Sequence, residues 1–240
     1  MIIAVDGPAG AGKSTVCKIL AERLGFVYLD TGAMYRALAW ALLEADGRKQ
    51  QAENGLPSHL ADWSLPAARL EALPLLFSIR KNRLEIFYGE RPLCDELRSP
   101  EISEAASRIS RLPAIREFLV SWQRKLAEQG NIVAEGRDTT TVVFPEAGLK
   151  IFLIADLQTR AQRRLKEYIE KGITLSLEEI RLAISQRDEA DAKRDHSPMR
   201  LAEGAVLLDT SDLEVEEVVD RLSELAGNII KPVSLDGREL

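Results

Sequence analysis

The first fifteen residues carry the clearest chemical signal, because Gly7-Pro-Ala-Gly-Ala-Gly-Lys-Ser14 matches the P-loop motif G-x-x-x-x-G-K-S/T. Its glycines let successive backbone N–H groups face a phosphate chain, and the following helix adds its positive dipole end. Lys13 would reach the β- and γ-phosphates, and the Ser14 hydroxyl would coordinate Mg²⁺. A glycine-rich turn that binds nothing is the alternative, but the strand before and the helix after the motif favour a nucleoside triphosphate site. The residues predicted to bind the triphosphate are Gly7, Pro8, Ala9, Gly10, Ala11, Gly12, Lys13, Ser14 and Thr15.

A second group of ionisable residues directly follows the apolar run 132–134 and consists of Glu135, Arg137 and Asp138. In a parallel sheet, the end of this strand would share an edge with the P-loop. We expect Glu135 to orient a water on Mg²⁺, Arg137 to bind a phosphate and Asp138 to accept hydrogen bonds from an amine. The alternative is an Arg–Asp ion pair in a surface turn.

Thr31 and Arg36 open the helix that follows the short predicted strand 26–29. Thr31 has the side chain of a helix N-cap, and Arg36 would present its guanidinium toward the mouth of the P-loop. A capped amphipathic helix with a solvated arginine fits this spacing equally well.

Arg187, Asp191 and Arg194 recur at i, i+4 and i+7, on one face of a helix. Such a charged run usually indicates a solvated, salt-bridged helix. Its position between the last two predicted parallel strands, however, is where P-loop kinases carry a mobile lid. Lid arginines can stabilise the charge that develops on a transferred phosphoryl group.

The composition is that of an ordinary globular chain: 240 residues, 45% hydrophobic and 29% charged. The formal net charge of −6 argues against a nucleic-acid polymer as a partner. Cys17 and Cys94 are not spaced as a metal site, which favours a reducing compartment. There is no apolar run of membrane-spanning length and no signal peptide. We therefore expect a cytoplasmic, monomeric protein with no membrane partner.

Strand and helix patterns alternate along the chain. Helices are predicted at 15–24, 30–45, 99–111, 113–129, 158–169, 177–190 and 215–225, with a short one ending near residue 70. Buried strands are predicted at 2–5, 26–29, 132–134, 149–155 and 205–209. Residues 46–57 are expected to be a loop, and 75–79, 84–88 and 91–94 to form a small antiparallel sheet inserted at the rim. The predicted fold is α/β, a P-loop NTPase-like three-layer α/β/α core around a parallel sheet.

Taken together, the motifs resemble those of the bacterial cytidylate kinase (CMP/dCMP kinase) family of P-loop nucleoside monophosphate kinases, over residues 1–226. The matching segments are I-x-x-D-G-P-x-G-x-G-K-S/T at the start, L-D-S/T-G-x-x-Y-R at 29–36, G-R-D-x-x-T-V-V-F-P at 136–145, K-I-F-L at 150–153 and R-D-x-x-D-x-x-R at 187–194. The β-rich segment before residue 95 also matches. The P-loop alone indicates only a nucleotide binder, whereas the combination is specific.

The resemblance implies a phosphotransferase that converts CMP and dCMP to CDP and dCDP with ATP and Mg²⁺, in pyrimidine nucleotide metabolism. It implies a core of residues 1–30, 131–170 and 199–227. It also implies an NMP-binding region at 31–130 with its insertion at about 46–98, a lid at 171–198, and a loosely ordered tail at 228–240.

Site residues are carried over by position. The implied CMP contacts are Thr31, Arg36, Arg137 and Arg194 around the phosphate, Ser107, Arg116 and Asp138 at the cytosine ring, and Arg187 and Asp191 at the ribose, with Tyr35 as a further CMP-binding residue. The implied catalytic residues are Lys13, Arg36, Arg137, Arg187 and Arg194, and the implied Mg²⁺ ligand is Ser14, with Glu135 acting through a water. A carboxylate suits the exocyclic amine of cytosine, and would reject uracil, which has a carbonyl there.

The sequence departs from the family pattern at two positions. Thr140 stands where the family usually has glycine, and because a β-branched residue resists positive φ, we expect a local change in the loop that carries Asp138. Ala190 stands where relatives often have another arginine, which we expect to weaken lid closure.

Two other functions fit parts of the pattern. Another small-molecule P-loop kinase would share the triphosphate site but use a different acceptor. A nucleotide-dependent switch that binds a protein partner would need no arginine-rich acceptor pocket. Measuring the release of ADP with different acceptors distinguishes the cytidylate kinase, another small-molecule kinase and the switch.

Overall fold

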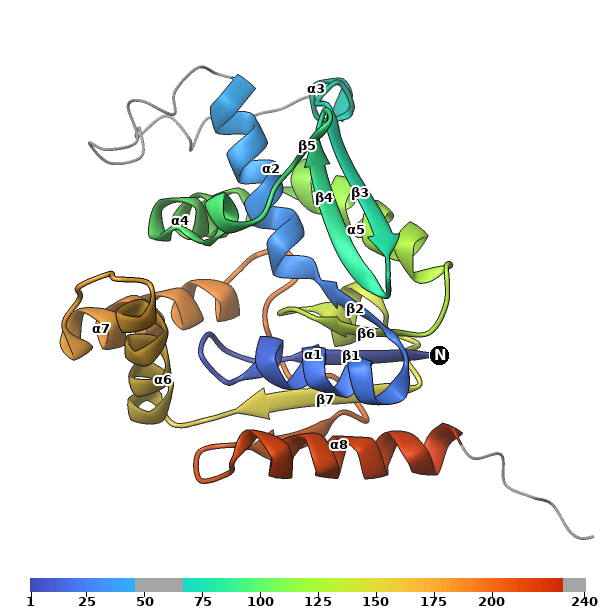
Figure 1. The fold of residues 1–240 in the computed structure, drawn as a ribbon, viewed down its shortest axis with the longest axis vertical. Helices are drawn as coiled ribbons and strands as arrows, with labels where there is room; N and C mark the ends of the chain where they lie inside the picture. Colours follow the sequence, from blue (N-terminus) through green and yellow to red (C-terminus); the bar gives the residue numbers. More distant parts are fainter. Residues whose placement is uncertain (46–66, 231–240) are drawn as a thin grey trace, which may run out of the picture.

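Strand β1 (Ile2–Asp6) lies inside a mixed sheet in this computed structural model, which describes residues 1–45 and 67–230. Its neighbours are β6 (Ile132–Glu135) and β7 (Leu149–Ile154), and the sheet continues through β2 (Val27–Asp30) beyond β6 and β8 (Val206–Asp209) beyond β7. All these pairs are parallel. Their carboxyl ends therefore meet at one edge, where the P-loop leaves β1 (Figure 1).

The hairpin of β3 (Leu75–Arg80) and β4 (Arg83–Tyr88), followed by the short β5 (Arg91–Pro92), is antiparallel as predicted. This small antiparallel sheet is joined to the core, because β4 pairs in parallel with β2 and extends the central sheet. The reason lies at the hairpin turn, where Asn82 adopts a φ of 59° and its carbonyl accepts a hydrogen bond from Tyr28 N at 3.0 Å. Strand β5 is also shorter than the predicted 91–94.

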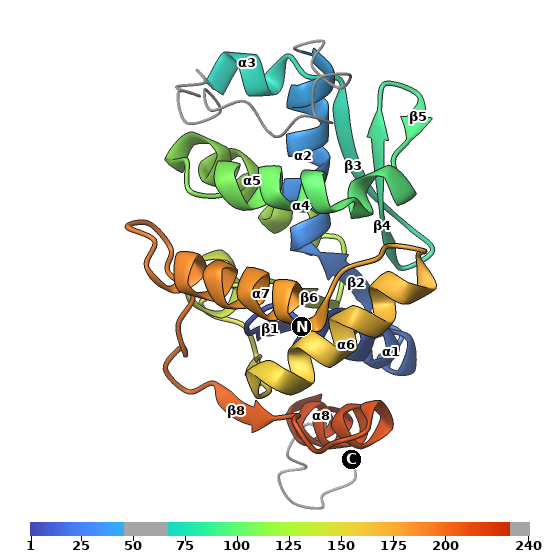
Figure 2. The same cartoon turned by 90° about the vertical axis from the view of Figure 1, so that its left-hand side faces the viewer.

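Alternating side chains of β1 enter two different cores. Ile3 and Val5 pack with α1 (Lys13–Leu24) and α8 (Val215–Ile230) on one face of the sheet. Ala4 faces the other side, toward the core built with α2 (Thr31–Ala45), α4 (Pro100–Ile109) and α5 (Pro113–Ala127). A strand with apolar residues on both faces is typical of a parallel sheet covered by helices on both sides. This confirms the predicted three-layer core (Figures 1 and 2).

Helices α6 (Leu157–Glu170) and α7 (Leu177–Ala192) lie beyond the carboxyl edge of the sheet (Figure 1). They share a small core of their own, made by Ala161, Ile180 and Ile184. The pair therefore packs as a unit that faces the P-loop. In the chain, helix α3 (Ala67–Glu71) precedes the hairpin strands and the 3₁₀ helix η3 (Asp95–Arg98) follows them.

The largest boundary error lies at the last helix, which was expected to end at residue 225. It continues to Ile230 because Ala226 is still buried in the core beside α1, so residues 228–230 are helical rather than tail. The predicted loop 46–57 and residues 231–240 of the predicted tail lie outside the described residues. No helix among the described residues is long and apolar enough to cross a membrane.

Gln123 is a polar residue on the core-facing side of α5, one turn from both Leu119 and Leu126. It is 1% exposed, and neither its amide nitrogen nor its amide oxygen has a hydrogen-bond partner. An unpaired buried amide destabilises a fold by about 1–3 kcal/mol. We expect Gln123→Met to raise Tm by at least about 2–4 °C in thermal unfolding, as about 1 kcal/mol does for a chain of this length. The matched change at exposed Gln162 should leave Tm unchanged, and a lower Tm for Gln123→Met would contradict the prediction.

Candidate active site

The P-loop wraps around the ammonium group of Lys13. Lys13 Nζ donates hydrogen bonds to Gly7 O at 2.8 Å and to Pro8 O at 2.7 Å. Gly7 has a φ of 146°, and a Cβ there would lie 2.0 Å from the Leu153 carbonyl oxygen, so only glycine fits. Burial lowers the pKa of Lys13 to about 7, helped by the neighbouring Arg137 and opposed by Glu135. An anion beside the P-loop would restore the charge.

Three carboxylates end adjacent strands at the same edge of the sheet. They are Asp6 of β1, Asp30 of β2 and Glu135 of β6, and Asp30 and Glu135 are partners in register. Burial and the nearby Asp30 raise the pKa of Glu135, while Lys13 and hydrogen bonds from the Tyr28 and Ser14 side chains lower it. The edge therefore brings an oxygen-rich cluster against the start of α1.

The start of α2 differs from the prediction in one respect. Asp30, not Thr31, caps the helix, because Asp30 Oδ1 accepts a hydrogen bond from Ala33 N at 2.8 Å. The Thr31 hydroxyl instead donates to the Glu135 carbonyl at 2.6 Å, which ties α2 to β6. Asp30 also pairs with Arg36 at 2.9 Å and holds that guanidinium at the edge of the site. Arg36 is therefore not the solvated residue of the alternative interpretation.

Asp138 and Arg116 form a buried ion pair beneath this edge. Burial raises the pKa of Asp138, and Arg116 opposes the shift. Arg116, from α5, also donates to the Ser110 carbonyl at 3.2 Å and lies 5.8 Å from the ring centroid of Tyr35. The predicted alternative of a surface Arg–Asp pair in a turn is wrong for Asp138, which is buried and whose partner comes from α5.

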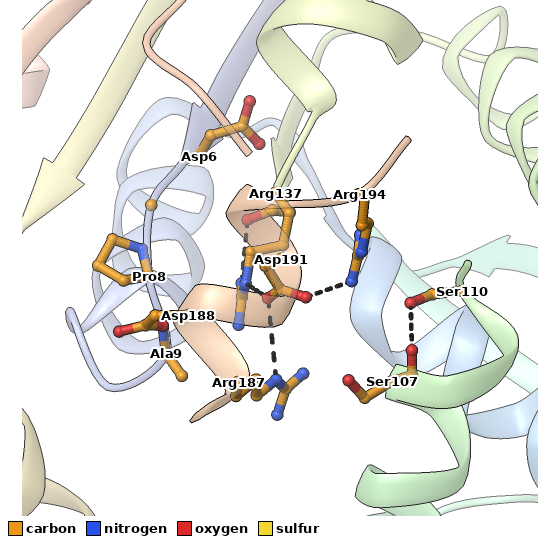
Figure 3. A network of polar contacts seen from close by, with 12 residues as sticks. Asp6, Pro8, Ala9, Ser107, Ser110, Arg137, Arg187, Asp188, Asp191 and Arg194 are labelled. Carbon is orange, nitrogen blue, oxygen red and sulfur yellow. Dashed lines mark hydrogen bonds and ion pairs between the residues drawn. The ribbon is translucent and has the colours of Figure 1, made fainter. Parts of the chain in front are cut away.

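Asp191 is the centre of the arginine cluster (Figure 3). It is 1% exposed, bonds to Arg137 at 3.0 Å and to Arg194, and lies 4.0 Å from Arg187. Burial alone would raise the pKa of Asp191, but the three guanidiniums hold it below its usual value. A solvated helix would leave this carboxylate in water, so that interpretation of the charged run is wrong at Asp191.

Five buried donors around this cluster have no hydrogen-bond partner. They are Tyr35 Oη and the Nε atoms of Arg36, Arg116, Arg187 and Arg194. These groups are close enough to interact electrostatically: Tyr35 interacts with Arg116 and Arg194, and Arg187 interacts with Arg36. Buried donors are rarely left unpaired in native proteins. Their convergence indicates a site built to receive an anion with several acceptor oxygens.

Ser107, predicted to contact the base, lies on α4 on the opposite side of the arginine cluster from Pro8 and Ala9 of the P-loop (Figure 3). Its carbonyl accepts a hydrogen bond from the Ser110 hydroxyl at 2.7 Å. The residues carried over from the family motifs come from the P-loop and α1, from α2, α4, α5 and α7, and from the segments that follow β6 and α7. Ala190, at the second departure from the family pattern, is half-buried on α7 next to Asp191.

Sequence reasoning missed two contacts that organise the site. Asp188 of α7 bonds to Ala9 N of the P-loop at 3.1 Å and also pairs with Arg160 of α6. Asp6 accepts hydrogen bonds from Thr139 and Thr140. Both aspartates lie inside recognised motifs, but their partners are more than 25 residues away in the sequence, and no local pattern indicates such pairs.

Thr140 does not adopt a positive φ in this structure. Positive φ among the described non-glycine residues occurs only at Lys81, Asn82 and Ser197. Thr140 instead belongs to a short π-helical turn, η4 (Thr139–Val143), which needs no left-handed residue there.

Comparison with known proteins points to the same family as the sequence motifs. The family model described as cytidylate kinase matches residues 3–228. The chain is 44% identical over 227 residues to the cytidylate kinase of Carboxydothermus hydrogenoformans, covering 95% of this chain and 97% of the relative. It is 42% identical to that of Salinibacter ruber (92% and 94% covered) and 40% identical to that of Lactococcus lactis subsp. cremoris MG1363 (95% and 98% covered).

Proposed function

The chain belongs to the cytidylate kinase family, and from this we propose that the arginine cluster around Asp191 promotes transfer of the γ-phosphoryl group of ATP to CMP or dCMP. The observation that carries the proposal is the set of five unpartnered buried donors around the arginine cluster. The phosphates and the base of the bound nucleotides would supply the missing acceptor atoms.

The reaction is an in-line displacement. A phosphate oxygen of CMP attacks the γ-phosphorus of ATP, the bond to the β–γ bridging oxygen breaks, and ADP leaves with that oxygen. No general base is required, because the acceptor phosphate is already largely ionised near neutral pH. The protein contributes position, charge and exclusion of water.

Cationic residues would bind both the phosphates of ATP and the acceptor phosphate of CMP. Lys13 and the P-loop N–H groups would hold the β- and γ-phosphates of ATP. Thr31, Arg36, Arg137 and Arg194 would hold the acceptor phosphate, with Arg187 stabilising the charge that develops between them. Asp191 keeps three of these guanidiniums in place and, with Arg187, would contact the ribose.

The cytosine ring would lie against the Asp138–Arg116 pair. The Asp138 carboxylate would accept hydrogen bonds from the exocyclic amine, and Arg116 and Ser107 would donate to the ring acceptors. Uracil would place a carbonyl opposite a carboxylate in a buried site, where an unpaired polar group is costly. This predicts a preference for cytosine of about 10⁴-fold.

The residues at the mouth of the P-loop suit a magnesium ion. Ser14 helps to lower the pKa of Glu135, which burial raises, and the two side chains present the oxygen ligands that Mg²⁺ prefers. Ser14 would coordinate the ion directly and Glu135 through a water. When bound, Mg²⁺ neutralises charge on the β- and γ-phosphates. In the described part of the chain no three His, Cys, Asp or Glu side chains form an all-protein metal site, so the nucleotide would supply the remaining ligands.

We further propose the division into core, NMP-binding region (31–130) and lid (171–198), with the lid closing when both nucleotides are bound. We also propose that the protein is a monomer and acts in the cytoplasm, where ATP and CMP are available.

The test is release of ADP from Mg-ATP by the purified protein, alone and with CMP, dCMP, UMP, AMP or GMP. We expect strong stimulation by CMP and dCMP and little by UMP. Stimulation by another monophosphate alone would keep the kinase and overturn the assignment of the base pocket. No stimulation by any of them would favour the nucleotide-dependent switch.

A further inference from the structure

Asp6, the last residue of β1, accepts four hydrogen bonds from two consecutive residues. Its Oδ1 accepts from Thr139 N at 2.8 Å and Thr139 Oγ1 at 2.6 Å. Its Oδ2 accepts from Thr140 N at 2.7 Å and Thr140 Oγ1 at 2.5 Å. All three residues are at most 1% exposed. We call this arrangement the Asp6 clamp.

The Asp6 clamp connects the two halves of the active site. Asp6 directly precedes Gly7, where the P-loop begins, and Thr139 directly follows Asp138. The backbone at Gly136, just before Arg137 and Asp138, is also closely packed. A Cβ on Gly136 would lie 2.6 Å from Thr139 Cγ2 and 2.7 Å from Thr31 Oγ1. The segment 136–140 is therefore held against both β1 and α2, and it has little freedom to move Arg137 or Asp138.

The threonine hydroxyls add two hydrogen bonds to Asp6 beyond the two that the backbone N–H groups make. Each carboxylate oxygen receives one backbone N–H and one hydroxyl, and a β-branched side chain has few rotamers to lose when it is fixed. Hydrogen bonds to a charged, buried group are roughly twice as strong as neutral ones. Loss of the Thr140 hydroxyl would leave one bond on Oδ2 and loosen the turn that follows Asp138.

We propose that the Asp6 clamp makes Thr140 a specificity-determining positioning residue, which acts through Asp6 to hold Asp138 where it meets the base of the acceptor nucleotide. The inference rests on the proposed function, since it concerns the residue proposed to contact cytosine. Thr140 is buried and its hydroxyl is bonded to Asp6, so it would act on the nucleotide only through its neighbours.

The experiment compares Thr140→Val, which has nearly the same shape without the hydroxyl, with Thr140→Ser, which keeps it. Steady-state kinetics with ATP and with CMP or UMP give KM for each nucleotide and the CMP/UMP ratio of kcat/KM. For Thr140→Val we expect KM for CMP to rise roughly tenfold and the CMP/UMP ratio to fall roughly tenfold, as the loss of one hydrogen bond to a charged group implies. KM for ATP should change by less than about twofold, because the P-loop keeps its bonds to Lys13.

Thr140→Ser should restore most of the selectivity. Thr141→Val is the matched control, because it removes a hydroxyl one residue further along that lies 3.4 Å from the Asp138 carbonyl and does not touch Asp6. It should behave as wild type. Asp6→Asn is a second test, since an amide cannot accept on both sides, and it should lower the CMP/UMP ratio at least as much as Thr140→Val.

The ratio and KM do not depend on how much of a variant is folded, so a lower Tm does not obscure the result. If wild type prefers CMP but Thr140→Val and Asp6→Asn keep its KM and CMP/UMP ratio, the clamp serves stability alone and the inference is wrong. If wild type shows no stimulation by CMP, the proposed function fails first, and the two failures are thereby distinguished.

Discussion

Replacement of Lys13 by alanine is expected to lower kcat by about 10³-fold or more, which corresponds to about 4 kcal/mol of transition-state stabilisation. Lys13 is the cation enclosed by the P-loop, with its ammonium bonded to the Gly7 and Pro8 carbonyls. A triphosphate beside it would draw that ammonium onto the β- and γ-oxygens, where charge shifts during transfer. Release of ADP from Mg-ATP in the presence of CMP measures the effect.

Lys18→Ala provides the control, because Lys18 lies on the same helix but is exposed. It should retain the activity of wild type. Thermal unfolding of Lys13→Ala should remain cooperative, since burial already disfavours the ammonium, whose pKa it lowers to about 7. Unimpaired turnover by a folded Lys13→Ala variant would show that the P-loop assignment is wrong.

Asp138→Asn is expected to reduce the CMP/UMP ratio of kcat/KM by about 10²-fold or more, chiefly through a higher KM for CMP. A carboxylate can only accept hydrogen bonds from the cytosine amine, whereas an asparagine amide can also donate to the uracil carbonyl. The substitution therefore weakens the cognate contact and removes the penalty against the competitor. Kinetics with each monophosphate in turn measures both effects.

The same substitution leaves Arg116 without its buried anionic partner. We expect a loss of about 3–5 kcal/mol in the free energy of unfolding, so kinetics should be measured well below the Tm of the variant. Glu104→Gln is the control, because Glu104 forms an exposed ion pair with Arg108 at 2.6 Å on α4. An unchanged CMP/UMP ratio for Asp138→Asn would remove Asp138 from the base pocket while leaving the kinase reaction intact.

Local patterns predicted most of the scaffold correctly. The glycines and apolar runs around Lys13 gave strand, loop and helix in the right order, because a buried strand and a P-loop restrict the chain within a few residues. Periodicity also placed α5 and α7 within a few residues of their observed bounds. These patterns did not show what distant packing decides: β4 joins β2 across the sheet, and Ala226 continues α8 past its expected end.

For the candidate site, the sequence supplied residue types, and the family motifs supplied their grouping. Spacing alone left Arg36 and the 187–194 run open between solvated and functional interpretations. Only the fold decided between them, by burying Asp191 among three arginines and by pairing Arg36 with Asp30. Whether a helix residue is buried depends on the elements that pack against the helix. The sequence of the helix alone therefore does not determine it.

The sequence by itself therefore determined the P-loop between strand and helix, the layer architecture and the family. These depend on residues that are neighbours along the chain or on a pattern shared across its whole length. The tertiary structure decided which charges are partners. Asp6 with Thr140, Asp138 with Arg116 and Asp188 with the P-loop each join segments that are far apart in the sequence. Such pairs form only when strand ends and helices converge at one edge of the sheet, since hydrogen bonds and ion pairs act over a few ångströms.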